Sequence, residues 1–349
     1  MNEPNPFGFD PNEAGLPAQK EGKRPLLEHI SGDDYALRID NSMLEVFETC
    51  PRSAEYYAVN RRQAPPSAAL AFGGAIHEGL AILYKQGFTR ANLAEAIDAT
   101  TNYLLKNPVA PDQWRTPELA CDILREYFDK YELTDPIKPI MIEGEIGVER
   151  RFSLALGVID VNAVIDQPVQ LLTNRTDIDI PDTAIKRIHV LWTGRMDIAC
   201  THLSDVISVC DHKTSSMGGP TFFQDFQLSQ QTHGYCWAVS KLIGKPVTSF
   251  ILNAIIQRKP SRTGKNLTLE RQFYKYEEAH LQEWERDVMA HVENFVHCLY
   301  TNYFPKNTKW CMGKYGRCQY HDICTLPPEQ RLVMLNSSLY QNVSWSPLL

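Results

Sequence analysis

The sequence contains no apolar run that approaches the roughly 18 residues needed to cross a bilayer, so we expect no membrane association. Its first ten residues, MNEPNPFGFD, have neither the basic start nor the apolar core of a secretory signal peptide. These two absences predict a cytoplasmic protein. In that compartment the nine cysteines are expected to be free thiols or metal ligands rather than disulfides.

The chain also lacks a surplus of positive charge. Its 35 Lys and Arg residues are outnumbered by 42 Asp and Glu residues, which gives a net charge of −7. This balance excludes a uniformly basic coat for nucleic acid, although it permits a local basic groove. No Gly-x-x-x-x-Gly-Lys-Ser/Thr loop occurs, so the chain carries no P-loop ATPase and any helicase would be a separate partner.

The hydrophobic content of 43% and the charged content of 22% are typical of a globular protein. We expect a disordered, proline-containing tail over residues 1–35, an ordered domain over 36–330, and a C-terminal tail over 331–349. Within the ordered domain, residues 85–135 have the apolar spacing of a helical insert. After Pro136 the pattern changes to short strands.

Two of these strands flank the loop Thr201–Asp205 and form a predicted hairpin. If the loop centres near residue 203 or 204, Asp197 lies opposite residue 209 or 211. Because side chains alternate along a strand, Asp211 and Lys213 then share a face with Asp197. Cross-strand neighbours of this kind lie roughly 5–8 Å apart, so the two carboxylates could bind one divalent cation together.

A cation would resolve the repulsion between two buried aspartates, one of which would otherwise take up a proton. Mg²⁺ prefers oxygen ligands. It can activate water for attack, while Lys213 orients that water or offsets charge on a phosphate. The alternative is a solvent-exposed hairpin with an ordinary Asp–Lys pair, which the short motif alone would favour. The motifs before and after the hairpin favour the metal site.

Two predicted helices carry polar residues that could serve this hairpin. The first covers residues 68–83, and His77 lies at the edge of its buried face, either as an ordinary helix residue or as an extra metal ligand. The second covers Phe223–Leu242. One face of this helix carries the polar residues Gln227, Gln231 and Tyr235. That face is either exposed to solvent or directed toward a substrate.

A basic segment follows the next predicted strand. Between residues 258 and 275 there are six basic residues and one acidic residue, Glu270. The segment is either a solvated hairpin tip or an arm that contacts phosphates. The basic residues are Arg258, Lys259, Arg262, Lys265, Arg271 and Lys275.

Three cysteines cluster near the C-terminus, at positions 311, 318 and 324. Thiolates suit zinc or an iron–sulfur cluster. His321 could complete a zinc site, whereas a distant cysteine would complete a four-thiolate cluster, and Cys50 is the candidate. A link from Cys50 to this cluster closes a loop of about 260 residues, and long closures constrain the unfolded chain most. We therefore expect a structural latch rather than an electron carrier.

In combination, these motifs resemble those of the PD-(D/E)XK nuclease superfamily, in particular its RecB-like branch with an iron–sulfur cluster. That branch includes CRISPR-associated exonucleases and phage exonucleases. The resemblance runs from about Ser42 to Cys324. It implies an α/β fold with a restriction-endonuclease-like mixed-sheet core flanked by helices, and with the C-terminal cysteine cluster as a latch.

The resemblance also implies roles for individual residues. His77, Asp197, Asp211 and the backbone carbonyl of His212 would hold Mg²⁺ or Mn²⁺. Lys213 would be catalytic, and Gln231 and Tyr235 would position it and the DNA. A 4Fe–4S cluster would be bound by four cysteines, with zinc as the alternative because six residues rather than the family's usual two separate the first pair of the C-terminal trio. The four are Cys50, Cys311, Cys318 and Cys324.

The implied function is a metal-dependent deoxyribonuclease, an exonuclease of DNA recombination, repair or phage DNA processing. Its substrate would be single-stranded DNA or duplex with an end, in the cytoplasm of a bacterium or of a phage-infected host. A helicase, recombinase or annealing protein would be its partner. One alternative is a non-catalytic nucleic-acid-binding or assembly subunit, against which the intact acidic and lysine positions argue. A zinc-latched binding module is the other.

Overall fold

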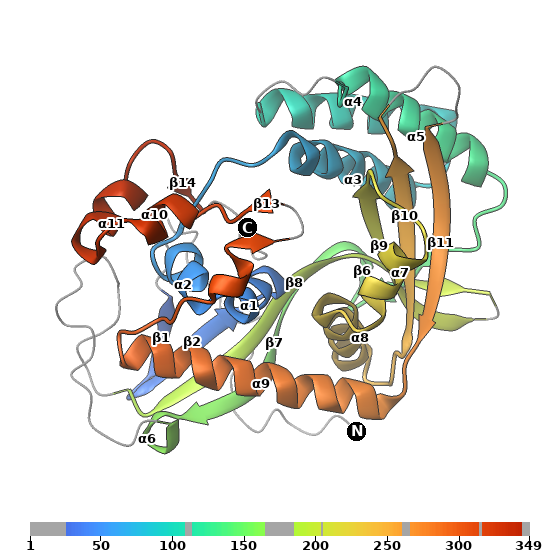
Figure 1. The fold of residues 1–349 in the computed structure, drawn as a ribbon. Helices are drawn as coiled ribbons and strands as arrows, with labels where there is room; N and C mark the ends of the chain where they lie inside the picture. The colour runs from blue at the N-terminus through green and yellow to red at the C-terminus, as the bar shows by residue number, and fades with distance from the viewer. Residues whose placement is uncertain are drawn as a thin grey trace. The chain divides into compact units, whose positions relative to one another are not determined.

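The computed structural model describes residues 26–108, 114–164, 185–203, 205–259, 266–313 and 316–343. The chain divides into two compact units (Figure 1). The first unit comprises Met1–Gln63, Phe152–Gly194 and Glu285–Leu349, and the second comprises Ala64–Arg151 and Arg195–Trp284. Three elements run through both units: β7 (Val148–Asp160), β8 (Arg187–His202) and α9 (Glu278–Tyr300).

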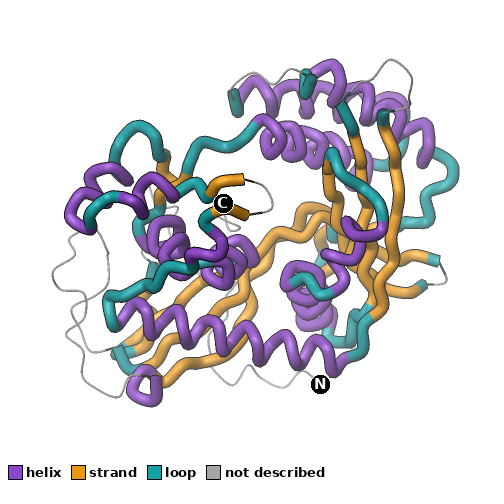
Figure 2. Tube along the Cα trace, viewed as in Figure 1, coloured by secondary structure: helices purple, strands orange, loops and turns teal. Residues whose placement is uncertain are grey.

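The second unit contains a mixed sheet with helices packed on it (Figure 2). Strand β8 pairs antiparallel with β9, β9 pairs parallel with β10, and β10 pairs antiparallel with β11. The expected mixed sheet flanked by helices is confirmed. Its elements are α3 (Ala68–Gln86), α4 (Arg90–Lys106), α5 (Pro117–Tyr131), β4 (Lys138–Pro139), β5 (Met141–Ile142), β6 (Glu145–Ile146), β9 (Val206–Ser215), α7 (Pro220–Gln227), α8 (Gln230–Ile243), β10 (Ser249–Gln257) and β11 (Leu267–Lys275).

One hydrophobic core joins α3, α4 and α5 to the strands of this unit. Helix α3 begins where Ser67 accepts a hydrogen bond from the backbone of Leu70, a common N-cap. Farther along, a Cβ atom at position 73 would lie 2.6 Å from Thr214 Oγ1, so only glycine lets α3 approach the end of β9 this closely. This close approach brings the next turn of α3, with His77, toward the hairpin.

The first unit contains β1 and β2 beside the N-terminal part of β8, with β2 parallel to β8. Helix α1 begins where Asp40 accepts a hydrogen bond of 2.8 Å from the backbone of Met43, a common N-cap for aspartate. The elements are β1 (Leu27–Ser31), β2 (Asp34–Ile39), α1 (Asn41–Thr49), α2 (Pro51–Ala54), a π-helical turn (Glu55–Val59), β3 (Arg62–Gln63), α6 (Val161–Val164), a 3₁₀ turn (Thr308–Trp310), β12 (Met312–Gly313), β13 (Gly316–Arg317), α10 (His321–Thr325), α11 (Pro328–Leu335) and β14 (Gln341–Asn342).

The predicted tails are too long at both ends. Strand β1 and the start of β2 lie within residues 1–35, where Leu27 of β1 and Tyr35 of β2 are buried and the two strands pair with each other. At the other end, α11 extends to Leu335 and β14 pairs with β3, so residues 331–349 are not simply a tail. Residues 1–25 and 344–349 lie outside the described part of the chain.

The predicted helix Phe223–Leu242 is two helices. Helix α7 ends at Gln227, and Ser229 then caps α8 by accepting a hydrogen bond from the backbone of Gln231. The serine side chain competes with the helical hydrogen bonds at this point. Across the described ranges, no helix is both long and apolar enough to span a membrane.

The core of the second unit can be tested on α3. Leu83 is fully buried (0% exposed), whereas Leu70 on the same helix is 68% exposed. We predict that Leu83→Ala lowers the free energy of unfolding by about 2–5 kcal/mol, because it leaves a cavity. Leu70→Ala should change it by no more than about 0.5 kcal/mol. Urea denaturation measures both, and equal losses would contradict the described packing of α3.

Candidate metal centre

The hairpin of β8 and β9 brings the two predicted aspartates opposite each other. His202 pairs with Val206 at one end of this ladder, and Ile198 pairs with Cys210 at the other. Continued by one more residue on each strand, this register places Asp197 opposite Asp211, which is one of the two predicted arrangements. Both side chains are buried, with exposed fractions of 7% and 2%.

Asp197 is held by two groups from different elements. The backbone N–H of His212 donates a hydrogen bond of 2.7 Å to Asp197 Oδ2, and His77 Nδ1 lies 3.4 Å from the same oxygen. Burial favours the protonated acid, but the charge and hydrogen bond of His77 outweigh it and lower the pKa of Asp197. Asp197 is therefore ionised at neutral pH.

Asp211 has a different environment. Burial, together with the negative charge of Asp197, raises the pKa of Asp211 to about 6, although the ammonium of Lys213 opposes this rise. The Nζ atom of Lys213 lies 2.5 Å from Asp211 Oδ2. The two aspartates therefore differ in pKa, and a cation between them would favour the ionised form of both.

The structure adds an acidic residue that the sequence reasoning missed. Glu149, at the start of β7, joins His77 and Asp197 in a group whose ligand atoms all lie within 4.8 Å of one another. Burial and the charge of Asp197 raise the pKa of Glu149 to about 7, while Arg195, 3.0 Å away, opposes them. Its backbone is left-handed, with φ of 53°, which is uncommon outside glycine and often marks functional sites.

Gln231 and Tyr235 lie one turn apart on α8. Gln231 Nε2 donates to Tyr235 Oη (3.1 Å), and Tyr235 Oη donates to the carbonyl of Arg195 (2.9 Å). This second bond ties α8 to β8 two residues before Asp197. Gln227 does not share their face, because it belongs to α7.

The imidazole of His77 and the carboxylates near it fit a divalent cation. One imidazole nitrogen and nearby carboxylate oxygens are ligands that Mg²⁺ and Mn²⁺ accept. The raised pKa values of Asp211 and Glu149 reflect buried negative charge, which such a cation would neutralise.

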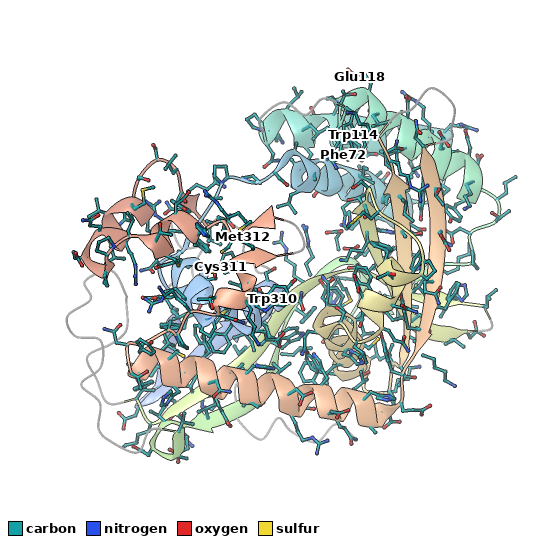
Figure 3. The ribbon with its side chains drawn as sticks, in the orientation of Figure 1. Phe72, Trp114, Glu118, Trp310, Cys311 and Met312 are labelled. Atoms are coloured by element: carbon teal, nitrogen blue, oxygen red, sulfur yellow. The ribbon has the colours of Figure 1, made fainter. Side chains whose placement is uncertain are left out.

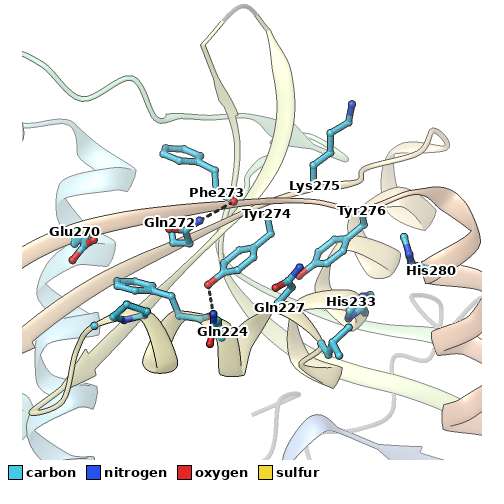
Figure 4. Close-up of a pocket in the computed structure, with 14 residues that line it drawn as sticks. Gln224, Gln227, His233, Glu270, Gln272, Phe273, Tyr274, Lys275, Tyr276 and His280 are labelled. Atoms are coloured by element: carbon cyan, nitrogen blue, oxygen red, sulfur yellow. Dashed lines mark hydrogen bonds between the residues drawn. The ribbon is translucent and has the colours of Figure 1, made fainter.

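The pocket drawn in Figure 4 lies elsewhere in the second unit. It has a cavity volume of about 560 Å³ and is lined by α7, α8, β11 and the start of α9. Tyr274 on β11 and Tyr276, just after its end, point toward the helices, and Tyr274 Oη donates to the carbonyl of Phe223 (2.7 Å). None of the candidate metal ligands lines it, so this pocket is separate from the candidate metal centre.

The basic segment is only partly described. Arg258 and Lys259 are exposed at the end of β10, whereas Arg262 and Lys265 lie outside the described residues. Arg271 is not part of an exposed arm, which corrects that interpretation. Its guanidinium is buried and forms an ion pair of 2.7 Å with Asp135.

In the first unit, segments from the two ends of the chain meet at the predicted cysteines. Cys50 Sγ accepts a hydrogen bond of 3.3 Å from the backbone of Asn307, and Ser53 Oγ lies 3.9 Å from Cys318 Sγ. The backbone of Cys318 donates to the carbonyl of Cys311 (3.0 Å). Burial raises the pKa of Cys324, and the neighbouring Cys50 and Cys318 add to this rise.

The surface beside this cluster is apolar. Figure 3 labels Trp310 and Met312 on either side of Cys311, and both are more than half exposed. The alternative ligand His321 lies beside Asp322, with 3.6 Å between Nδ1 and Oδ1. The remaining cysteines are buried thiols, as expected for structural residues: Cys121, Cys200, Cys210, Cys236 and Cys298.

The fold and site define an α/β protein with an acidic, lysine-containing centre for a divalent metal. Residues 41–325 match the sequence pattern of the PD-(D/E)XK nuclease superfamily. The match covers most of the chain, which therefore belongs to that superfamily, whose members are metal-dependent nucleases.

Among the solved structures that resemble this chain is a protein from Eubacterium rectale described as a candidate exonuclease. The alignment has 13% identity and a TM-score of 0.46, and it covers 86% of this chain and 93% of the other. Likeness at this level says nothing about activity. Among curated proteins, no sequence matches this chain.

The role of Glu149 can be tested through metal affinity. Glu149→Gln keeps the shape of the side chain but removes its charge. We expect it to weaken Mn²⁺ binding, measured by calorimetry, by about 10- to 100-fold, the range found for residues that support metal sites. Glu145→Gln is the matched control, since Glu145 is exposed and pairs with Arg150. Equal affinities in both variants would remove Glu149 from the site.

Proposed function

We propose that this protein is a divalent-metal-dependent DNA exonuclease that hydrolyses phosphodiester bonds. The observation that carries this proposal is the buried pairing of Asp197 and Asp211 on one hairpin, with Lys213 beside Asp211. The exonuclease mode and the role in recombination, repair or phage DNA processing rest on the family resemblance. An assembly subunit without activity would not need a buried acidic centre of this kind.

Each residue then has a distinct task. A bound divalent cation supplies Lewis-acid activation of the scissile phosphate and of water. Asp197 stays ionised for binding because His77 lowers its pKa, and the N–H of His212 holds its Oδ2 atom in place. Lys213 offsets the charge that develops on the phosphate, since its ammonium is fixed beside Asp211.

Other residues complete the centre. His77 and Glu149 contribute further ligands, and the carbonyl of His212 is a further candidate ligand. Gln231 and Tyr235 position β8 through the carbonyl of Arg195. Phosphates of single-stranded or end-containing DNA would contact the basic segment, namely Arg258, Lys259, Arg262 and Lys265. A helicase, recombinase or annealing protein in the cytoplasm would supply that DNA.

The catalytic assignment predicts a separation of binding from chemistry. Lys213→Ala should lower the cleavage rate by about 10²- to 10³-fold, as loss of one transition-state contact does. Its Mn²⁺ affinity should remain, because lysine is not a ligand. Asp211→Ala should lose both DNA cleavage and Mn²⁺ affinity. Cleavage of end-labelled linear DNA measures the rate, with closed circular DNA as the substrate that an exonuclease leaves intact.

The control for this experiment is Lys245→Ala, since Lys245 is exposed after the end of α8. It should cleave DNA as the unchanged protein does. Full activity in Asp211→Ala would contradict the nuclease site.

We also propose that Cys50, Cys311, Cys318 and Cys324 bind a 4Fe–4S cluster as a structural latch. The support is the meeting of the segments around Cys50 and Cys318, where a backbone N–H donates to Cys50 Sγ and Ser53 Oγ lies beside Cys318 Sγ. The aromatic cluster of Tyr56, Tyr320 and Tyr340 packs beside Cys318 and Cys324. A zinc ion held by the C-terminal trio and His321 is the alternative.

The latch predicts that cysteines far apart in sequence behave alike. Purified without oxygen, the protein should be brown and hold about four irons, as a four-cysteine cubane does. Cys50→Ser and Cys324→Ser should both lose the colour and lower the melting temperature. Cys121→Ser should keep the brown colour. A colourless protein with one zinc, lost in His321→Ala but not in Cys50→Ser, would establish the zinc alternative.

A further inference from the structure

A row of three polar side chains crosses the sheet behind the metal centre. His212 on β9 pairs with Asn253 on β10, and Asn253 pairs with Arg271 on β11. These strands lie side by side (Figure 1). Because side chains alternate, His212 points to the face opposite Asp211 and Lys213. His212 and Asn253 are both buried, and Asn253 is fully so.

The donor and the acceptor of each hydrogen bond between these three side chains can be assigned in only one way. Arg271 Nε donates to Asn253 at 3.1 Å, and a guanidinium can only donate, so the carbonyl oxygen of Asn253 faces Arg271. The amide nitrogen of Asn253 therefore faces His212 Nδ1, 2.7 Å away. His212 Nδ1 must accept that bond, which places the proton of a neutral ring on Nε2.

Further contacts hold the row rigid. Arg271 makes bonds of 2.7 and 3.0 Å to the two carboxylate oxygens of Asp135. Its guanidinium also lies 3.9 Å from the ring centroid of Tyr131. The amide nitrogen of Asn253 donates a second bond, of 2.9 Å, to Tyr127 Oη. Buried networks whose members all have partners specify one arrangement of their side chains.

We propose that Asn253 is a positioning residue of the metal centre. It clamps the ring of His212 on one face of β9. The backbone N–H of His212 donates to Asp197 Oδ2 at 2.7 Å, and the neighbouring side chains of Asp211 and Lys213 project from the other face of β9. The clamp thus fixes the segment of β9 that presents Asp211 and that holds Asp197 of β8 through the N–H of His212. The catalytic consequence rests on the proposed nuclease function, but the effect on metal binding does not.

The direction of the network can be tested in the unchanged, metal-free protein. Nitrogen NMR of ¹⁵N-histidine-labelled protein, assigned with His212→Gln, should show His212 as a neutral ring with the proton on Nε2. Asn253→Asp should move this proton to Nδ1, because a carboxylate only accepts. Once the signal of His212 is assigned, a proton on its Nδ1 in the unchanged protein would overturn the proposal.

The positioning effect is tested through Mn²⁺ affinity measured by calorimetry. Asn253→Leu removes both bonds of the amide nitrogen, and we expect it to weaken Mn²⁺ binding by about 10- to 100-fold, as loss of supporting residues does elsewhere. Asn253→Asp keeps a bond to His212 and should bind Mn²⁺ nearly as the unchanged protein does. This rescue would not follow if Asn253 only filled space.

Thr100→Val is the matched control. Thr100 is also fully buried in the second unit and donates to the carbonyl of Ala75 (3.0 Å), away from His212. It should lose stability but keep Mn²⁺ affinity. Unchanged Mn²⁺ affinity in a folded Asn253→Leu variant would overturn the proposal. Since neither measurement uses DNA, an absence of DNA cleavage would reject the nuclease and leave this inference standing.

Discussion

The organisation of the site depends on the conflict between carboxylates that share a buried space. Asp197 is held ionised by His77 and by the N–H of His212, while Asp211 and Glu149 have raised pKa values because they are buried near its charge. Lys213 forms an ion pair with Asp211 and Arg195 forms one with Glu149, yet burial and the charge of Asp197 still raise the pKa of both carboxyl groups. A divalent cation with oxygen ligands would remove this conflict, which is why a metal-dependent reaction is the natural use of this centre.

The surrounding fold supplies rigidity on both sides of the hairpin. On one face, Tyr235 on α8 holds the carbonyl of Arg195. On the other face, Asn253 and Arg271 hold the ring of His212 within a buried network. Helix α3 brings His77 within reach because Gly73 allows it to approach Thr214. A metal site on paired strands can therefore keep its geometry without contributions from mobile loops.

The sequence predicts this centre only where the cause is local. Asp197, Asp211 and Lys213 could be placed together because a short hairpin and the alternation of side chains set their register. Glu149 could not, since its left-handed backbone and its approach to Asp197 arise from tertiary packing. Arg271 was misread because a count of charges assumes solvent, whereas its partner Asp135 lies 136 positions earlier. The strand at Leu27 was missed for a similar reason: a proline-containing composition hides a short segment that pairs with its neighbour.

The most direct test of this account is a crystal of the protein soaked with Mn²⁺, with the ion located by its anomalous scattering. We predict one peak or two adjacent peaks among the side-chain ligand atoms of His77, Glu149, Asp197 and Asp211. Binding should also draw Asp211 and Glu149 into contact with the ion, because their raised pKa values reflect charge that it neutralises. Anomalous density that lies only away from the hairpin of β8 and β9, or Mn²⁺ that binds without contact to Asp197, would contradict the account.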